Sequence, residues 1–375
     1  MLRSLALRSP ALRRVARYVR DRTRRCDGLP GGLDFETLDA LCREHGRGGL
    51  KRCAHLRLSG WKSGGVCGTY RLELRTEAGA SWRLIFKDEC YRAELSPALQ
   101  GLPISPGPPE AVVYRMQQPF LAPFLPQLFW FREIEPGRHF QYLLEDLAAS
   151  YAERHRGTLY SLKAARGLAL VQVQRALRKT FVGKHADGLI RYDRRYSERL
   201  LEYAGTNLAD YLALIADSAV ATLLDRWHDV AAVHQRDEFY DDGLRAPIHG
   251  DFAVHNVLAH RHDKSQLKVL DWEWAGIGLP HADLAALIKS VRREDHPALL
   301  QAFMEQDRSL DAEQHRRLFH WCLLERRLFH AAFAARQQLL SQRRVPWLTR
   351  KITDSAGAAL AAAEWLGARR TGVAA

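Results

Sequence analysis

The sequence predicts an α+β fold with a small β-rich N-terminal lobe and a larger, mainly helical C-terminal lobe. Segments with strand patterning gather between residues 56 and 144, whereas helical patterning dominates from residue 148 to the C-terminus. At 375 residues, the chain is also long for a single compact core. We therefore expect a basic helical extension over residues 1–50, an N-terminal lobe over 51–147 and a helical lobe over 148–375.

The strands of the N-terminal lobe are predicted from alternation and from β-forming residues. Tyr70–Leu74 alternates with a period of two, and Trp82–Lys87 is rich in residues that favour strands. Two further strands are expected over 127–133 and 139–144. A proline-rich loop ends just before Glu110, where proline is well tolerated at a helix start, so a helix is expected to begin there.

Cysteine usage and hydropathy indicate the compartment. The six cysteines are scattered without a C-x-x-C pair, which argues against a zinc framework or a disulfide scaffold and favours a reducing environment. No stretch approaches the roughly 18 apolar residues that a membrane-spanning helix needs. We therefore expect a cytoplasmic protein without a transmembrane segment.

The net charge of +13 predicts attraction to anions, without choosing among nucleotides, phosphorylated substrates, anionic lipids and nucleic acids. Arginines are concentrated in residues 1–25 and alternate there with apolar residues. This arm is interpreted either as a solvated basic helix or as an amphipathic helix that makes peripheral contact with an anionic membrane at its inner face. No recognisable DNA- or RNA-reading motif accompanies the charge, so no specific nucleic-acid partner is expected.

The strongest chemical signal is a cluster of oxygen-bearing side chains between residues 249 and 271. Asp251 follows His249-Gly, Asn256 follows five residues later, and Asp271 ends an apolar strand in the sequence Asp-Trp-Glu. Asp251 can orient an attacking hydroxyl, while Asn256 and Asp271 supply the oxygen ligands that Mg²⁺ prefers. Glu273 is either a further ligand or a carboxylate behind the metal site.

These motifs resemble those of the aminoglycoside phosphotransferase and choline-kinase group, whose catalytic loop is H-G-D-x4-N and whose metal motif is D-x-[DE]. Pro280–Ala285 matches the P-x-x-D-L-A that follows in this group. The resemblance implies a bilobal protein-kinase-like fold, with Asp251 as the catalytic residue and Asp283 as a helix cap or a brace of the catalytic loop. A protein kinase is a distant alternative, because H-G-D replaces H-R-D and neither D-F-G nor A-P-E is present.

The same resemblance assigns nucleotide-binding residues in the N-terminal part. Lys87 matches the lysine that contacts the donor phosphates, and Glu110 is its expected partner, with Glu94 as a weaker rival. The remaining positions belong to a glycine-rich phosphate-covering loop and to the segment that receives adenine through its backbone: Gly64, Gly65, Gly68, Glu145 and Leu147. Taken alone, the glycines are equally typical of a hairpin turn.

The resemblance implies an ATP-dependent phosphotransferase that uses Mg²⁺ and acts on a hydroxyl of a small molecule, sugar or glycan. The basic stretch Arg175–Arg199 contains no acidic cluster that would suit polycationic drugs, which favours a glycan, a lipid-linked sugar or a phosphorylated metabolite. A solvated helix face explains this stretch equally well. The alternatives are a catalytically inactive, nucleotide-binding scaffold and, less favoured, a basic nucleic-acid-binding protein, and the choice between ATP and GTP stays open.

Overall fold

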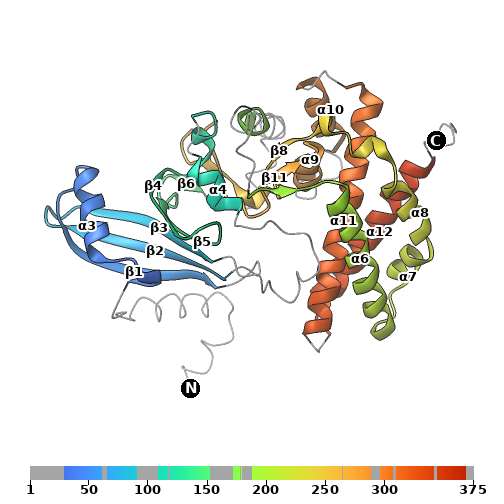
Figure 1. Ribbon diagram of the computed structural model, residues 1–375, viewed down its shortest axis with the longest axis horizontal. Coiled ribbons are helices and arrows are strands. Elements are labelled where there is room, and N and C mark those ends of the chain that lie inside the picture. Colours follow the sequence, from blue (N-terminus) through green and yellow to red (C-terminus); the bar gives the residue numbers. More distant parts are fainter. Residues whose placement is uncertain are drawn as a thin grey trace. The chain divides into compact units, whose positions relative to one another are not determined.

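The computed structural model describes residues 29–60, 66–90, 109–116, 119–152, 172–177, 179, 188–263, 265–288, 296–306, 310–341 and 344–368. These residues form two compact units, shown in Figure 1. The first unit contains the described residues up to 90 together with 126–147. The second contains the described residues between 109 and 125 and those from 148 onward. An antiparallel sheet in one unit and a helical second unit confirm the predicted α+β class.

The first unit is built on a five-stranded antiparallel sheet with the order β1-β2-β3-β5-β4. The bounds of the strands are β1 Leu50–Gly60, β2 Val66–Thr76, β3 Ser81–Cys90, β4 Leu128–Glu135 and β5 His139–Glu145. Every strand predicted in the N-terminal part is therefore present. The register places Lys87 of β3 opposite Thr69 of β2 and Tyr142 of β5, in the middle of the sheet.

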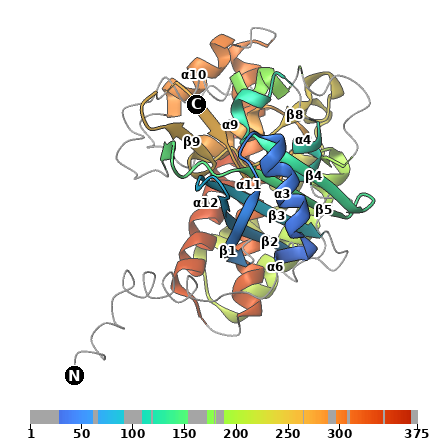
Figure 2. The ribbon, with the colours of Figure 1, turned by 90° about the vertical axis from the view of Figure 1, so that its left-hand side faces the viewer.

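Helix α3 (Phe35–Glu44) packs against this sheet (Figures 1 and 2). The Asp34 carboxylate caps the helix by accepting a hydrogen bond from the Thr37 N–H, which satisfies one of the unpaired N–H groups of the first turn. The apolar face of the helix contributes its buried residues to one core with the sheet, which includes Leu38, Leu41, Cys42, Leu72, Leu74, Leu84 and Phe86. Burial of this face against the sheet stabilises a helix that is too short to persist alone.

Long helices dominate the second unit (Figure 1). Their bounds are α6 Arg194–Leu214, α7 Ser218–Asp225, α8 Trp227–His234, α9 His281–Ile288, α10 His296–Gln306, α11 Ala312–Leu340 and α12 Pro346–Ala368. Helix α11 packs against α12, α6 and α9, so it forms the centre of this helical layer. Helix α4 (Pro109–Arg115) begins at the proline before Glu110, as the sequence predicts.

Two small three-stranded sheets carry the loops that matter for the site. One has the order β10-β9-β6 and the other β7-β11-β8, with bounds β6 Tyr151–Ala152, β7 Ile190–Arg191, β8 Ala246–Ile248, β9 Val257–His260, β10 Leu267–Val269 and β11 Gly276–Gly278. The sequence predicts that helix dominates from residue 148 onward, and it does not predict β6 and β7. Each of these strands has two residues and pairs with a strand far along the chain, so local periodicity carries no signal for it.

None of the helices in the described ranges combines the length and the apolar character that crossing a membrane requires.

A buried histidine in the helical unit predicts a pH effect on stability. The His234 ring is buried against Trp321, and burial lowers the pKa of His234 to about 4. The unfolded chain binds a proton at this residue below about pH 6.5, whereas the folded chain does not until about pH 4. Acidification through this window therefore favours the unfolded state.

We expect the free energy of unfolding of the wild type, relative to that of His234→Asn, to fall by up to about 1.4 kcal/mol per pH unit between pH 6.5 and 4. Urea unfolding followed by circular dichroism measures this difference, which should be constant above pH 7. A difference that stays constant from pH 7 down to pH 4 would contradict the effect.

Candidate active site

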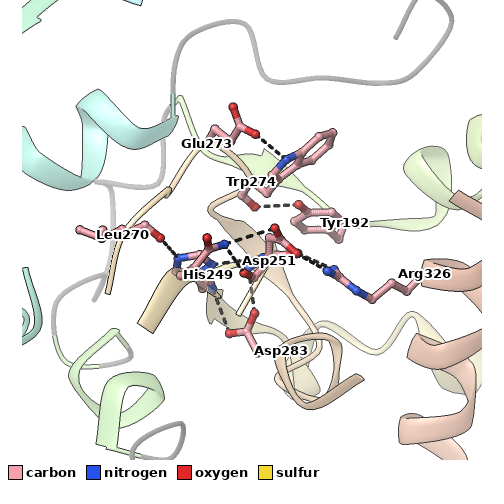
Figure 3. A network of polar contacts seen from close by, with 10 residues as sticks. Tyr192, His249, Asp251, Leu270, Glu273, Trp274, Asp283 and Arg326 are labelled. Atoms are coloured by element: carbon pink, nitrogen blue, oxygen red, sulfur yellow. Dashed lines mark hydrogen bonds and ion pairs between the residues drawn. The ribbon is translucent and has the colours of Figure 1, made fainter. Parts of the chain in front are cut away.

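The predicted catalytic loop follows β8 and turns sharply at Gly250. Gly250 has a φ of +80°, and a Cβ atom at this position would lie 1.9 Å from the carbonyl oxygen of Trp274. The Tyr192 hydroxyl donates a 2.7 Å hydrogen bond to the same carbonyl oxygen (Figure 3). Only glycine combines this backbone conformation with so close an approach, so the loop is held against the Trp274 backbone and Tyr192.

Replacement of Gly250 by alanine should therefore destabilise the protein. The left-handed conformation alone costs a non-glycine residue about 1–3 kcal/mol, and the contact with Trp274 adds to it. Gly357→Ala is the matched control, because its Cβ atom meets no neighbour and glycine inside a helix is unfavourable by roughly 0.5–1 kcal/mol. Thermal or urea unfolding should show a large loss for the first variant and none for the second. Equal stability of the two variants would contradict the close approach at Gly250.

Asp283, in the first turn of α9, braces the loop. Its two carboxylate oxygens accept hydrogen bonds from the backbone N–H groups of His249 (2.9 Å) and Gly250 (2.8 Å), as Figure 3 shows. Complete burial raises the pKa of Asp283 to about 6, although the two N–H donors act in the opposite direction. The prediction that Asp283 braces the loop is confirmed.

The His249 ring also holds the loop. Its Nε2 atom lies 3.0 Å from the Leu270 carbonyl oxygen, and its Nδ1 atom accepts a hydrogen bond from the Asp251 N–H at 3.2 Å. Burial lowers the pKa of His249 to about 4, so the neutral ring donates through Nε2 and accepts through Nδ1. His249 thus connects the catalytic loop to the strand that precedes Asp271, and its role in the loop is structural.

The Asp251 carboxylate is held on both sides. Arg326 of α11 forms an ion pair with Oδ1, and the Asn256 amide nitrogen lies 3.3 Å from Oδ2 and 2.9 Å from the Asp251 carbonyl oxygen. Burial alone would raise the pKa of Asp251, but the Arg326 guanidinium beside the carboxylate outweighs burial and the pKa is lowered. Asp251 is therefore an oriented, ionised carboxylate.

Asn256 and Asp271 lie at the same end of the β9–β10 pair. Val257 and Val269 are opposite each other in that pair, and the Leu270 N–H donates a 2.7 Å hydrogen bond to the Asn256 carbonyl oxygen. The hairpin therefore brings the two predicted metal ligands to neighbouring positions. Because the amide nitrogen of Asn256 is directed at Asp251, the amide oxygen is the atom suited to a cation.

Asp271 has a strained backbone. Its φ is +65°, and it is the non-glycine residue with positive φ in the described part of the chain. Asp and Asn tolerate this region better than other residues with side chains, and such conformations gather at functional sites. Asp271 is exposed, as a ligand for a hydrated ion should be.

The sequence left the role of Glu273 open, and the structure shows one hydrogen bond of its side chain. Its carboxylate accepts the indole N–H of Trp274 at 3.1 Å (Figure 3). Within the described ranges, no group of three or more His, Cys, Asp or Glu side chains is arranged to hold a metal ion. The donor set that fits Mg²⁺ here is instead one amide oxygen and one carboxylate, which is enough for an ion that keeps several waters.

The predicted nucleotide-binding residues fall in both units. Lys87 lies on β3 with its ammonium 3.8 Å from the Glu89 carboxylate. Gly68 lies on β2 opposite Gly60, and Gly64 and Gly65 lie outside the described residues.

Glu145 and Leu147 end the first unit after β5, where the Glu145 N–H donates to the Gln127 carbonyl oxygen at 2.9 Å. Glu110 is buried in α4 of the second unit, so its pairing with Lys87 stays a prediction.

Sequence reasoning missed Arg326, whose contact with Asp251 joins residues 75 positions apart. It also left the role of the basic stretch 175–199 open. Tyr192 of that stretch supports Gly250, and Tyr196 packs on Tyr192 and is buried. Arg194 stacks on Tyr240 and forms an ion pair with Asp237 on the surface. No motif or periodicity in the sequence marks Arg326.

The profile of the phosphotransferase enzyme family (APH) matches residues 109–321, which include Asp251, Asn256 and Asp271. The fold and the braced catalytic loop define a protein of the kinase-like phosphotransferase class. The chain belongs to the phosphotransferase enzyme family.

Solved structures share the fold across nearly their whole length. A protein from Ralstonia eutropha JMP134 assigned as an aminoglycoside phosphotransferase has a TM-score of 0.56 and 17% identity, covering 88% of this chain and 98% of that one. The GDP and kanamycin complex of APH(2″)-IIIa has a TM-score of 0.53 and 12% sequence identity, and the match covers 90% of this chain and 99% of that one. Choline kinase LicA from Streptococcus pneumoniae has a TM-score of 0.51 and 12% sequence identity, and the match covers 87% of this chain and 98% of that one. At these identities the similarity establishes the protein-kinase-like fold.

A curated relative matches only a short segment. Acyl-CoA dehydrogenase family member 11 of Gallus gallus is 49% identical over 45 residues, which is 12% of this chain and 6% of that protein. The chain therefore spans a small part of the length of this relative.

Proposed function

We propose that this chain transfers the γ-phosphoryl group of ATP or GTP to a hydroxyl of a small molecule, sugar or glycan. The observation that carries the proposal is the braced, ionised Asp251 beside Asn256, at the end of the hairpin that also positions Asp271. The complex of a structural relative with GDP supports a nucleotide donor, and family membership supports phosphoryl transfer.

In the proposed reaction, Asp251 accepts the proton of the acceptor hydroxyl as its oxygen forms a bond to the γ-phosphorus. The bond between that phosphorus and the nucleoside diphosphate breaks in the same in-line displacement. Orientation by Asp251 contributes typically about 10² to 10⁴ in rate. Mg²⁺, when bound by Asn256 and Asp271, neutralises charge on the phosphate oxygens.

We further propose that residues 51–147 hold the donor and residues 148–375 hold the acceptor and the catalytic loop. Lys87 contacts the donor phosphates, and Glu110 holds Lys87 in place. Gly64, Gly65 and Gly68 let the backbone approach the phosphates, and the backbone at Glu145 and Leu147 receives the purine.

The test is a turnover screen with the purified full chain, Mg²⁺, ATP or GTP, and a panel of sugars, amino sugars, lipid-linked saccharides and aminoglycosides. We expect acceptor-dependent release of nucleoside diphosphate, a product heavier by one phosphoryl group in mass spectrometry, and loss of both signals with a chelator. Calorimetric titration showing that neither ATP nor GTP binds would overturn the proposal.

A further inference from the structure

The part of the site formed by α11 carries positive charge directly at Asp251. The Arg326 guanidinium forms an ion pair with the Asp251 carboxylate and donates a 2.9 Å hydrogen bond to the Gly250 carbonyl oxygen (Figure 3). The Nε–H of the same guanidinium is buried and has no acceptor among the residues that the structure describes. A buried donor without a partner is costly, so Arg326 can hold one more oxygen ligand after a modest rearrangement.

Helix α12 places a second cation near the same carboxylate. The Lys351 ammonium interacts electrostatically with both Asp251 and Arg326. Lys351 is half-buried, and no residue of the described ranges forms an ion pair or a hydrogen bond with its ammonium. Burial lowers the pKa of Lys351, although Asp251 acts in the opposite direction. A half-buried lysine and an arginine that lie within electrostatic range of each other are both stabilised when an anion binds between them.

Besides Asp251, two acidic residues of this unit, Glu325 and Asp283, are already engaged. The Glu325 carboxylate accepts a hydrogen bond from the Ser197 hydroxyl, and burial raises the pKa of Glu325 to about 7, which reduces its negative charge near neutral pH. Asp283 accepts two N–H groups of the catalytic loop. With Glu325 and Asp283 engaged in this way and Asp271 expected to hold Mg²⁺, a cationic acceptor would meet the repulsion of Arg326 and Lys351.

We infer that the acceptor carries an anionic group, a phosphate or a carboxylate, which Arg326 and Lys351 bind next to Asp251. This inference rests on the proposed phosphotransferase function and narrows its substrate class. Arg326 is then a specificity-determining residue with two positions. Without acceptor it pairs with Asp251, and with acceptor it turns toward the anion and leaves the Asp251 oxygen to accept the hydroxyl proton.

The first experiment compares acceptors that share hydroxyl groups and differ in charge: glucose, glucosamine, glucose 6-phosphate and gluconate. We expect the wild type to show at least about a tenfold higher kcat/KM for an anionic member than for glucose, and the lowest value for glucosamine. Arg326→Gln and Lys351→Gln should each reduce this preference by about tenfold, and Arg326→Lys should restore part of it. Arg350→Gln, an exposed neighbour on α12, is the matched control and should keep the preference. A purely structural role for Arg326 would lower all rates without changing the ratio.

The second experiment measures binding of inorganic phosphate by calorimetry in the presence of Mg²⁺ and saturating ADP, which occupies the donor site. Lys351→Gln should weaken phosphate binding by at least about tenfold, whereas Arg350→Gln should not. Equal phosphate affinity of the wild type and Lys351→Gln, or fastest turnover of glucosamine, would overturn the inference. Failure of the wild type to bind any of ADP, ATP, GDP and GTP would instead overturn the proposed function, and Lys351-dependent phosphate binding would then still support the anion site.

Discussion

Asp251→Asn should reduce kcat/KM by about 10² to 10⁴ with little change in nucleotide affinity. The asparagine keeps the size of the side chain and the approach of Asn256, which lies 3.3 Å from Asp251 Oδ2. It removes the carboxylate charge that pairs with Arg326 and the oxygen that, in the proposed reaction, accepts the proton of the acceptor hydroxyl. Steady-state kinetics with an acceptor found in the turnover screen measures the loss, and nucleotide titration measures the retained affinity.

A matched control separates the loss of chemistry from a general effect of charge. Asp210→Asn on α6 removes one exposed carboxylate far along the chain from the catalytic loop and should leave kcat/KM unchanged. Arg326 loses its anionic partner in Asp251→Asn, so unfolding of this variant must also be measured at the assay temperature. Wild-type turnover by folded Asp251→Asn would remove Asp251 from the mechanism.

The catalytic loop could be predicted from the sequence because its parts lie close together along the chain. His249, Asp251 and Asn256 belong to one turn, and Asp271 follows after a single hairpin, so spacing alone places them together. The brace from Asp283, which is 34 residues from His249, could be expected only from the family resemblance, because Asp283 belongs to the P-x-x-D-L-A match. Strands β2 to β5 of the first unit were predictable because alternation and β-forming residues are local signals.

The remaining features depend on tertiary packing. Arg326 is one of several arginines on a helix of 29 residues, and only the packing of α11 against the catalytic loop distinguishes it from the others. Lys351 likewise gains its role from the position of α12. The pairing of Lys87 with Glu89 follows from the shared face of one strand and was not among the predictions.

Substitutions at Asp271 should separate the chemistry of the carboxylate from the backbone strain. Every replacement removes the carboxylate that is the predicted charged Mg²⁺ ligand, and a metal contributes several kcal/mol to the transition state, so we expect losses of roughly 10² to 10⁴ in kcat/KM for Asp271→Asn, Asp271→Gly and Asp271→Ala. The three variants should differ in their free energy of unfolding even though they lose similar activity, because φ is +65° at this residue. Glycine adopts this conformation at no steric cost and asparagine nearly so, whereas alanine is disfavoured by about 1–2 kcal/mol.

The comparison of the three variants is therefore the informative measurement. Asp271→Asn and Asp271→Gly should be as stable as the wild type in urea unfolding and yet inactive at ordinary Mg²⁺ concentrations, and part of the activity of Asp271→Asn should return as the Mg²⁺ concentration is raised. Asp271→Ala should be both inactive and less stable. If Asp271→Asn turned over its acceptor at the wild-type rate and with the wild-type dependence on Mg²⁺, the carboxylate would have no part in metal binding. The strain at Asp271 would then need another explanation, because a non-glycine residue persists in this conformation only where the surrounding structure enforces it.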